Sequence, residues 1–128
     1  MTTITLPWPS RMLSSNTRAN PFAVAAAVRV ARRAAWALCL DAGIKRKKLT
    51  NPVLRFTFRP PDNRRRDVHN MPHAMKAYID GVQDATGIND ALFRCDFPMK
   101  FADVVKGGRI VIEITDHVEI QMKGTIND

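Results

Sequence analysis

The chain has 128 residues, the length of one ordinary domain with a single modest core. Hydrophobic residues make up 45% of it and charged residues 25%, which excludes a disordered or fibrous protein. Twenty Lys and Arg against twelve Asp and Glu give a formal net charge of +8, and such a balance favours nucleic acid or an anionic membrane surface as the partner.

The sequence also indicates the cellular compartment of the protein. The N-terminal residues form no signal peptide, membrane anchor or lipidation motif, so we expect a cytoplasmic protein in a bacterial host cell. The most apolar stretch, residues 22–40, is interrupted by three arginines and is not expected to span a bilayer. Cys39 and Cys95 lack metal-ligand spacing, so we expect reduced structural thiols and no zinc site.

The first third of the chain predicts a strand and a long helix. Residues 3–6 form a short alternating run among prolines, which predicts a strand ending at Trp8. After a polar loop, Asn20 and Pro21 have the pattern of an N-cap followed by proline at the first helical position. The alanine-rich run that follows predicts a helix up to Gly43.

Two basic groups belong to this region. Arg29, Arg32, Arg33 and Trp36 recur at helical spacing, so the helix should carry one basic stripe and one apolar face. That stripe is either a solvated helix surface or a DNA contact. Residues 45–48 form a second basic cluster, which suits contact with backbone phosphates.

The middle of the chain predicts a second strand and a second helix. Residues 53–58 alternate and end at two prolines, as a strand would. Met71 and Pro72 open a helix that should run to about Ala85, with Gly87 terminating it. The apolar face of this helix comprises Met75, Tyr78, Ile79 and Val82, and the other side carries His73, Lys76, Asp80 and Asp84.

The last third predicts the strongest strand. Residues 110–115 alternate between Ile or Val and polar residues. A further strand is expected around residues 92–95 and an irregular extended piece near 99–105, whereas the tail after Asp116 is either a short strand or frayed. The chain is thus predicted to be a single α/β (α+β) domain over residues 1–128, with a small mixed sheet flanked by two main helices.

The most informative stretch is Arg64, Arg65 and Arg66 followed directly by Asp67. Consecutive guanidiniums repel one another, so a folded domain keeps them together where a polyanion neutralises them. Carboxylates next to such a cluster repel phosphate unless a divalent cation lies between them. Arginines, carboxylates and a lysine together are the chemistry of metal-assisted phosphodiester cleavage. The alternative is a solvated turn with a local Arg–Asp ion pair, and this stretch alone leaves both open.

Four blocks in order resemble the RusA family of Holliday junction resolvases. Residues 4–9 resemble the N-terminal strand motif of the family, and residues 15–18 the Ser/Asn/Arg loop after it. Residues 61–70 are similar to a basic run followed by an Asp-x-Asp-Asn signature. Residues 76–90 resemble the helix with a lysine and later paired acids, and residues 106–109 the Lys-Gly-Gly-Arg lead into the final strand. The blocks cover most of residues 3–115, and the chain would be a divergent, phage or prophage-type member.

The resemblance implies a small homodimer that binds four-way or branched DNA and makes paired, metal-dependent nicks in it. Asp67 matches the first aspartate of the signature, Asn70 its asparagine, Lys76 the helix lysine, and Asp90 the second later acid. Mg²⁺ would be the cofactor, because a hard cation prefers carboxylate, water and phosphate oxygens. The resemblance also assigns DNA contacts, which comprise Arg64, Arg65, Arg66, Asn70, Asn16, Arg18, Lys106 and Arg109.

Three departures from the family pattern affect the metal site. His69 stands at the second aspartate of the signature and Asn89 at the first later acid, so two of four carboxylates are absent. Lys76 follows Asn70 three residues later than in the best-known form of the motif. His69 could supply an imidazole, which suits Mn²⁺ better than Mg²⁺, or act as a base, or be an ordinary turn residue. Asp80 could provide a third carboxylate or simply pair with Lys76 one turn earlier.

The expected catalytic residues are therefore Asp67, Asp90, Lys76 and His69, and the expected metal ligands are Asp67, Asp90, His69 and Asp80. A second hypothesis is a junction-binding protein of the same fold that has lost cleavage. A third is a basic accessory or regulatory protein with unrelated partners. We expect the apolar surface of the dimer to come from the sheet and from residues 92–101.

Overall fold

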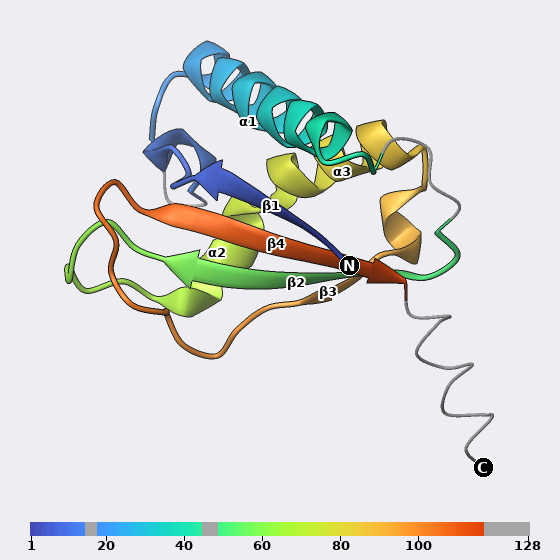
Figure 1. The fold of residues 1–128 in the computed structure, drawn as a ribbon. Coiled ribbons are helices and arrows are strands. Elements are labelled where there is room, and N and C mark those ends of the chain that lie inside the picture. Colours follow the sequence, from blue (N-terminus) through green and yellow to red (C-terminus); the bar gives the residue numbers. More distant parts are fainter. Residues whose placement is uncertain (15–17, 45–48, 117–128) are drawn as a thin grey trace.

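The structure is a computed structural model that describes residues 1–14, 18–44 and 49–116. In chain order its elements, with η for a 3-10 turn, are β1 (Thr2–Pro7), η1 (Arg11–Leu13), α1 (Pro21–Asp41), β2 (Pro52–Arg59), η2 (Val68–Asn70), α2 (Met71–Ala74), α3 (Lys76–Thr86), η3 (Asp90–Leu92), β3 (Arg94–Asp96) and β4 (Arg109–Asp116). This is the predicted mixture of helices with a mixed sheet (Figure 1). The predictions for Asn16, for residues 45–48 and for the tail after Asp116 lie outside the described residues.

The four strands form one sheet in the order β1-β4-β2-β3. β4 is antiparallel to β1 and to β2, whereas β2 and β3 are parallel. A parallel pair needs a crossover connection, and the segment with α2 and α3 provides it. The mixed character of the sheet therefore follows from placing one helical crossover between β2 and β3.

β1 and β4, and β2 from Leu54 onward, alternate between a core side and an outer side. The side chains on the core side are Ile4 and Leu6 of β1, Leu54, Phe56 and Phe58 of β2, and Ile110, Ile112 and Ile114 of β4, all of them buried. The helices pack against this side and form one hydrophobic cluster with it. Period-two alternation with one apolar face is what a sheet covered on one side requires.

The first helix begins and ends close to where the sequence predicts. The Asn20 side chain accepts a hydrogen bond of 2.8 Å from the Phe22 N–H, and Pro21 is the first helical residue. The helix ends at Asp41, and Gly43 follows with a φ of 78°, a value that favours glycine.

Gly81 allows α1 and α3 to pack closely. A Cβ built at Gly81 would overlap the Arg32 carbonyl oxygen and lie 2.7 Å from the Ala35 Cβ. The two helices therefore meet backbone to backbone at this point, and their outward-facing side chains lie on one continuous surface.

The structure corrects several predicted boundaries. β1 ends at Pro7, and the second helix is divided at Met75 into α2 and α3, although Met75 and Ile79 continue the backbone hydrogen bonding. The strand predicted at residues 92–95 lies at 94–96, because Asn89 caps the turn η3 before it. Residues 97–108 contain no strand, but Ala102 donates to the Phe58 carbonyl at 2.9 Å and holds this loop to β2.

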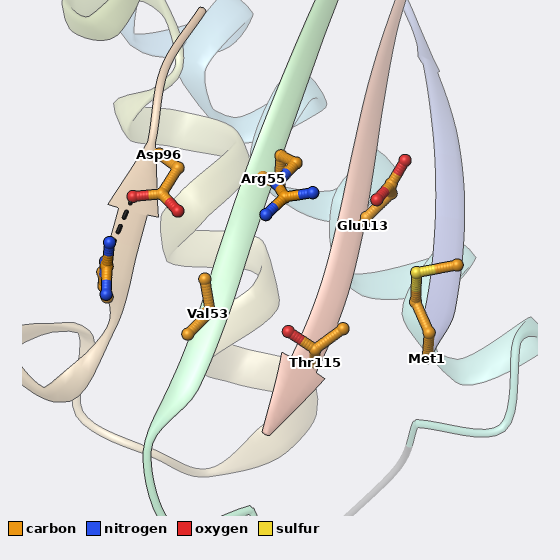
Figure 2. A pocket seen from close by; sticks show the side chains of 7 residues that line it. Met1, Val53, Arg55, Asp96, Glu113 and Thr115 are labelled. Carbon is orange, nitrogen blue, oxygen red and sulfur yellow. Dashed lines mark hydrogen bonds and ion pairs between the residues drawn. The ribbon is translucent and has the colours of Figure 1, made fainter. Parts of the chain in front are cut away.

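The outer side of the sheet mixes charged side chains with Val53 and Met1, and the helices of the described residues lie on the other side. Figure 2 shows Arg55 of β2 between Asp96 of β3 and Glu113 of β4, in front of the strands. The three are register partners, so negative, positive and negative charges form a row across the sheet. A shallow hollow of about 340 Å³ lies here. Strand alternation puts most of the apolar side chains of the sheet into the core, and Val53 and Met1 lie beside the charged row. That the sheet contributes an apolar dimer surface stays a prediction.

Part of the other predicted dimer surface is apolar and exposed. In and beside residues 92–101, Leu92 is 58% exposed, Met99 78% and Val104 39%. No helix among the described residues combines the length and the apolar character that crossing a membrane would need, as we expected for residues 22–40.

Candidate active site and nucleic-acid interface

Lys76 joins two carboxylates on the exposed side of α3. Its Nζ lies 2.8 Å from Asp80 Oδ1 and 2.8 Å from Asp90 Oδ2. The Lys76 side chain is 63% exposed, and those of Asp80 and Asp90 are 20% and 31% exposed. We refer to these three residues as the Lys76 cluster.

The local fold explains why the cluster forms. Lys76 and Asp80 are one turn apart on α3, whereas Asp90 comes from the turn η3 after that helix. The Asp90 N–H donates to Gln83 Oε1 at 2.7 Å, which holds η3 against α3. Asn89 caps η3 by accepting from the Ala91 N–H at 2.9 Å.

The charges in the cluster stabilise one another. Hydrogen bonds to Asp80 and then to Asp90 raise the pKa of Lys76, and the hydrogen bond from Lys76 lowers the pKa of Asp90. Lys76 is therefore an ammonium and Asp90 a carboxylate at neutral pH. Two carboxylates converge on one cationic position, and their oxygens are of the kind that a hard divalent cation prefers.

Asp67 and His69 belong to a separate turn. Asp67 Oδ1 accepts a hydrogen bond of 2.9 Å from the His69 backbone N–H and caps η2, and both residues are exposed. Asp67 precedes α2 and Asp90 follows α3. In the described part of the chain, no three His, Cys, Asp or Glu side chains are grouped to hold a metal ion. That Asp67 and Asp90 share one cluster stays a prediction.

The three consecutive arginines have different surroundings. Arg66 pairs with Asp62 at 2.9 Å, its guanidinium lies 5.5 Å from the centre of the Trp8 ring, and its side chain is only 20% exposed. The Arg64 side chain is 75% exposed, and Arg65 is also exposed. The local Arg–Asp ion pair that the sequence offered as one alternative is present, since Arg64 Nη2 also lies 4.0 Å from Asp62 Oδ2. The other alternative, metal-assisted phosphodiester chemistry, stays a prediction.

Basic side chains gather at one end of the sheet. β2 ends at Arg59 and β4 begins at Arg109, and these residues are register partners on the outer side. Like charges directly opposite each other on adjacent strands are destabilising, so a bound anion would stabilise this pair. Lys106 and Arg109 are exposed on the β4 side, and the exposed Arg64 and Arg65 follow β2. We call these five residues the basic end.

Glycine and tryptophan packing holds the two loops of the basic end together. Gly108 has a φ of 68°, and a Cβ there would lie 2.9 Å from Trp8 Cβ and 2.9 Å from Pro61 Cδ. The Trp8 ring also packs against Phe101, with 6.3 Å between ring centroids. Segments from β1, from the loop after β2 and from the lead into β4 therefore meet around Trp8.

The basic stripe on α1 is present and is divided by one ion pair. Arg32 Nε lies 2.6 Å from Asp84 Oδ2, and a second bond of 2.8 Å joins the same two side chains. Arg29 and Arg33 are exposed beside it.

Two residues of these sites were missed by the sequence analysis. Gln83 positions Asp90, and no short-range pattern indicates a contact over seven positions across a helix end. Arg59 belongs to the basic end, and its place at the end of an alternating run before two prolines could have indicated it. Of the predicted DNA contacts, Arg18 and Asn70 are exposed.

Both cysteines are free thiols. Burial raises the pKa of Cys39 to about 11 and that of Cys95 to about 11, so both thiols stay protonated at neutral pH. A thiol in that state is a poor nucleophile and metal ligand, which fits the predicted structural role.

No family model matches the sequence. An uncharacterized protein of the bacterium Xylella fastidiosa, strain Temecula1, is 38% identical to it over 120 residues. That match covers 90% of this chain and 76% of the relative, so the similarity extends over nearly the whole domain rather than one motif. The chain belongs to the same protein family as this bacterial relative.

Proposed function

We propose that the protein is a structure-specific DNA endonuclease of the RusA type, which resolves four-way or branched DNA by paired, metal-dependent nicks. The observation that carries the proposal is the Lys76 cluster, in which two carboxylates and one ammonium meet at an exposed position. A basic end on the same domain supplies the positive surface that a polyanionic substrate requires.

The Asp80 and Asp90 carboxylates fit a hard divalent cation in donor type, and both contact the Lys76 ammonium, which would turn toward the substrate phosphate when a metal ion took its place between them. Mg²⁺, with Mn²⁺ as the alternative, would be held by Asp90 and Asp80, and by Asp67 and His69 in the DNA-bound dimer. When bound, it would lower the pKa of a water molecule and neutralise developing charge on the phosphate.

The remaining roles belong to side chains of the chain itself. Lys76 places a positive charge next to the carboxylates, where it can pair with a non-bridging phosphate oxygen or with the leaving oxygen. His69 is exposed, and its imidazole is the kind of group that can transfer a proton in such a reaction. Arg64, Arg65, Lys106 and Arg109 would bind backbone phosphates, whereas Arg66 orders the loop that presents them.

We propose a homodimer, because a four-way junction has two symmetric scissile positions that a two-fold protein can match with one active site each. Leu92 and Met99 are the exposed apolar residues that suit the contact. The charged row on the outer side of the sheet would lie outside the apolar centre of that interface.

The test is incubation of a synthetic four-way junction with the wild-type protein in Mg²⁺, in Mn²⁺ and in chelator. Paired nicks that need a metal are the expected result. Asp67→Asn should abolish nicking and leave junction affinity equal or higher, because the variant removes a negative charge facing phosphate. Asp103→Asn, a change at an exposed loop carboxylate, is the matched control and should nick normally.

A second candidate is a junction-binding protein without cleavage. It is favoured by one observation, that the described residues include no group of three metal-ligating side chains. Binding of a junction by a confirmed dimer, with no nicking in any divalent metal, would establish this candidate and reject the endonuclease.

A further inference from the structure

We propose that the outer face of α1 is a second DNA-binding surface, formed by Arg29, Arg33 and Trp36, along which a DNA strand approaches the Lys76 cluster. This inference rests on the proposed function, because it takes branched DNA as the substrate. It concerns a surface distinct from the basic end, with a different residue set and a different part of the fold.

The geometry of α1 brings these side chains together. Arg29, Arg33 and Trp36 are four and three positions apart, so they lie on one helix face. With Arg32 and Asp84 they line an open depression of about 510 Å³. Trp36 is 37% exposed, which is high for a tryptophan in a small domain.

The charge of this face selects an anionic partner. On this face Arg32 forms an ion pair with Asp84, whereas Arg29 and Arg33 form no ion pair with any of the described residues. The only acidic residue of α1 itself is Asp41, at the last position of the helix. Two unpaired guanidiniums one turn apart suit successive phosphates of a backbone.

The surface borders α3, the helix that carries Lys76 and Asp80. α1 and α3 are in close contact at Gly81, one position after Asp80. Lys76 and Asp80 also line a groove of about 280 Å³ together with Val24 and Val28 of α1. A strand lying on the α1 face therefore reaches the cluster without crossing the sheet.

Trp36 gives the surface a preference for unpaired nucleotides. An exposed indole next to guanidiniums is a stacking platform for a base, and it tolerates any sequence because every base has an aromatic face. A branch point offers unstacked bases, whereas the interior of a plain duplex does not. The α1 face should thus contribute more to binding branched or single-stranded DNA than to binding duplex DNA.

The experiment measures metal-free DNA binding by three variants of the full chain. The arginine variants are compared by the salt dependence of binding to a labelled four-way junction, and Trp36→Ala by its affinity for single-stranded and duplex DNA. In Arg29→Ala/Arg33→Ala the slope of log K against log salt should fall by about two units, since each phosphate contact contributes about 0.9. Arg55→Ala, an exposed arginine on the outer side of the sheet, is the matched control and should keep the wild-type slope. Trp36→Ala should weaken binding of a single-stranded oligonucleotide about fivefold or more and change duplex binding little.

Circular dichroism and thermal melting of each variant show whether it is folded. Folded variants with wild-type slopes and wild-type oligonucleotide affinity would overturn the α1 surface while leaving the endonuclease proposal intact. Wild-type protein that binds no DNA would overturn both. If the wild-type protein nicks in no divalent metal while Arg29→Ala/Arg33→Ala still lowers the salt slope, cleavage is rejected and the α1 surface is kept. Vesicles of phosphatidylcholine and phosphatidylserine form the last arm, and binding to them that depends on Arg29 and Arg33, without a DNA effect, would assign the face to membranes.

Discussion

The Lys76 side chain forms ion pairs with two carboxylates at once. Its ammonium contacts Asp80 and Asp90, so it both neutralises the carboxylates and fixes their oxygens near one point. Removing it frees two negative charges on a surface that should face phosphate. The effect on chemistry should therefore differ from the effect on affinity.

We expect Lys76→Ala to slow nicking about a hundredfold, the size typical of losing one preorganised charge contact, while junction affinity changes only a few-fold. Single-turnover nicking and equilibrium binding measure the two effects separately. NMR titration should also show the Asp90 pKa rising toward its ordinary value. Lys100→Ala, an exposed loop lysine, serves as the control. Equal losses in rate and affinity would mean that Lys76 contributes only to binding.

The Arg32–Asp84 pair predicts a pH-dependent stability. The hydrogen bond from Arg32 lowers the pKa of Asp84, so the folded state holds this carboxylate ionised to lower pH than the unfolded state does. The stabilisation is thus present above the unfolded pKa, about 4, and is lost as the pH falls through the folded value. Asp84→Asn should unfold at lower urea than wild type at pH 7, and the difference should shrink as the pH falls below about 4. A difference that stays constant over this range would contradict the pairing.

At the scale of elements, the α1–α3 contact depends on a missing side chain. Replacing glycine by alanine within a helix normally stabilises it by about 1 kcal/mol. At Gly81 the added methyl would overlap the backbone of α1, and overpacking of this kind costs about 1–3 kcal/mol. The overpacking cost should exceed the gain in helix propensity, because the overlapping atoms belong to backbone that cannot move aside as a flexible side chain could.

Gly81→Ala should therefore lower the free energy of unfolding, measured by urea denaturation. Gly87→Ala provides a comparison, since its Cβ would meet nothing within 4 Å and its cost would come only from a φ of 72°. If Gly81→Ala were neutral or stabilising, the close approach of the two helices would be wrong.

Local signals predicted most elements, and their limits are visible at particular residues. The Asn20–Pro21 cap, the Ile alternation of β4 and the glycine after α3 are short-range features, and each element lies where they indicate. The start of β3 was predicted too early, because the Asn89 side chain caps the turn η3 before it. Hydrophobic alternation does not show when a side chain competes with the backbone for such hydrogen bonds.

In the candidate site, too, contacts within one element were predictable from the sequence, whereas contacts between elements were not. Lys76 and Asp80 are one helical turn apart, so their ion pair was foreseeable, although the sequence left open whether Asp80 served as a ligand. The contact between Lys76 and Asp90 depends on how η3 folds back onto α3 through Gln83, which is tertiary structure. Arg66 pairs with Asp62 and lies over Trp8, and the second contact joins segments far apart in sequence.

At the scale of the whole molecule, substitutions of the three consecutive arginines should affect different properties, with Arg64 and Arg65 affecting DNA binding and Arg66 affecting stability. Arg64→Ala and Arg65→Ala should each flatten the salt dependence of junction binding by about one unit, because each removes one phosphate contact. Arg66→Ala should instead lower the melting temperature, because it removes the contacts with Asp62 and Trp8. Binding across a salt series and thermal melting measure the two outcomes. A slope change for Arg66→Ala as large as that for Arg64→Ala would contradict this division.

The position of β4 in the sheet has a consequence for how the chain reaches its fold during synthesis. β1 ends at Pro7 and β2 at Arg59, yet neither touches the other, because β4 lies between them and begins only at Arg109. On the ribosome, both earlier strands must wait with unpaired edges until the strand that joins them has emerged. Pairing across such a long stretch of chain makes nucleation slow, and an apolar face left uncovered meanwhile favours aggregation. A nascent chain stalled before β4 leaves the exit tunnel should therefore be protease-sensitive throughout, and become resistant in one step once that strand is free.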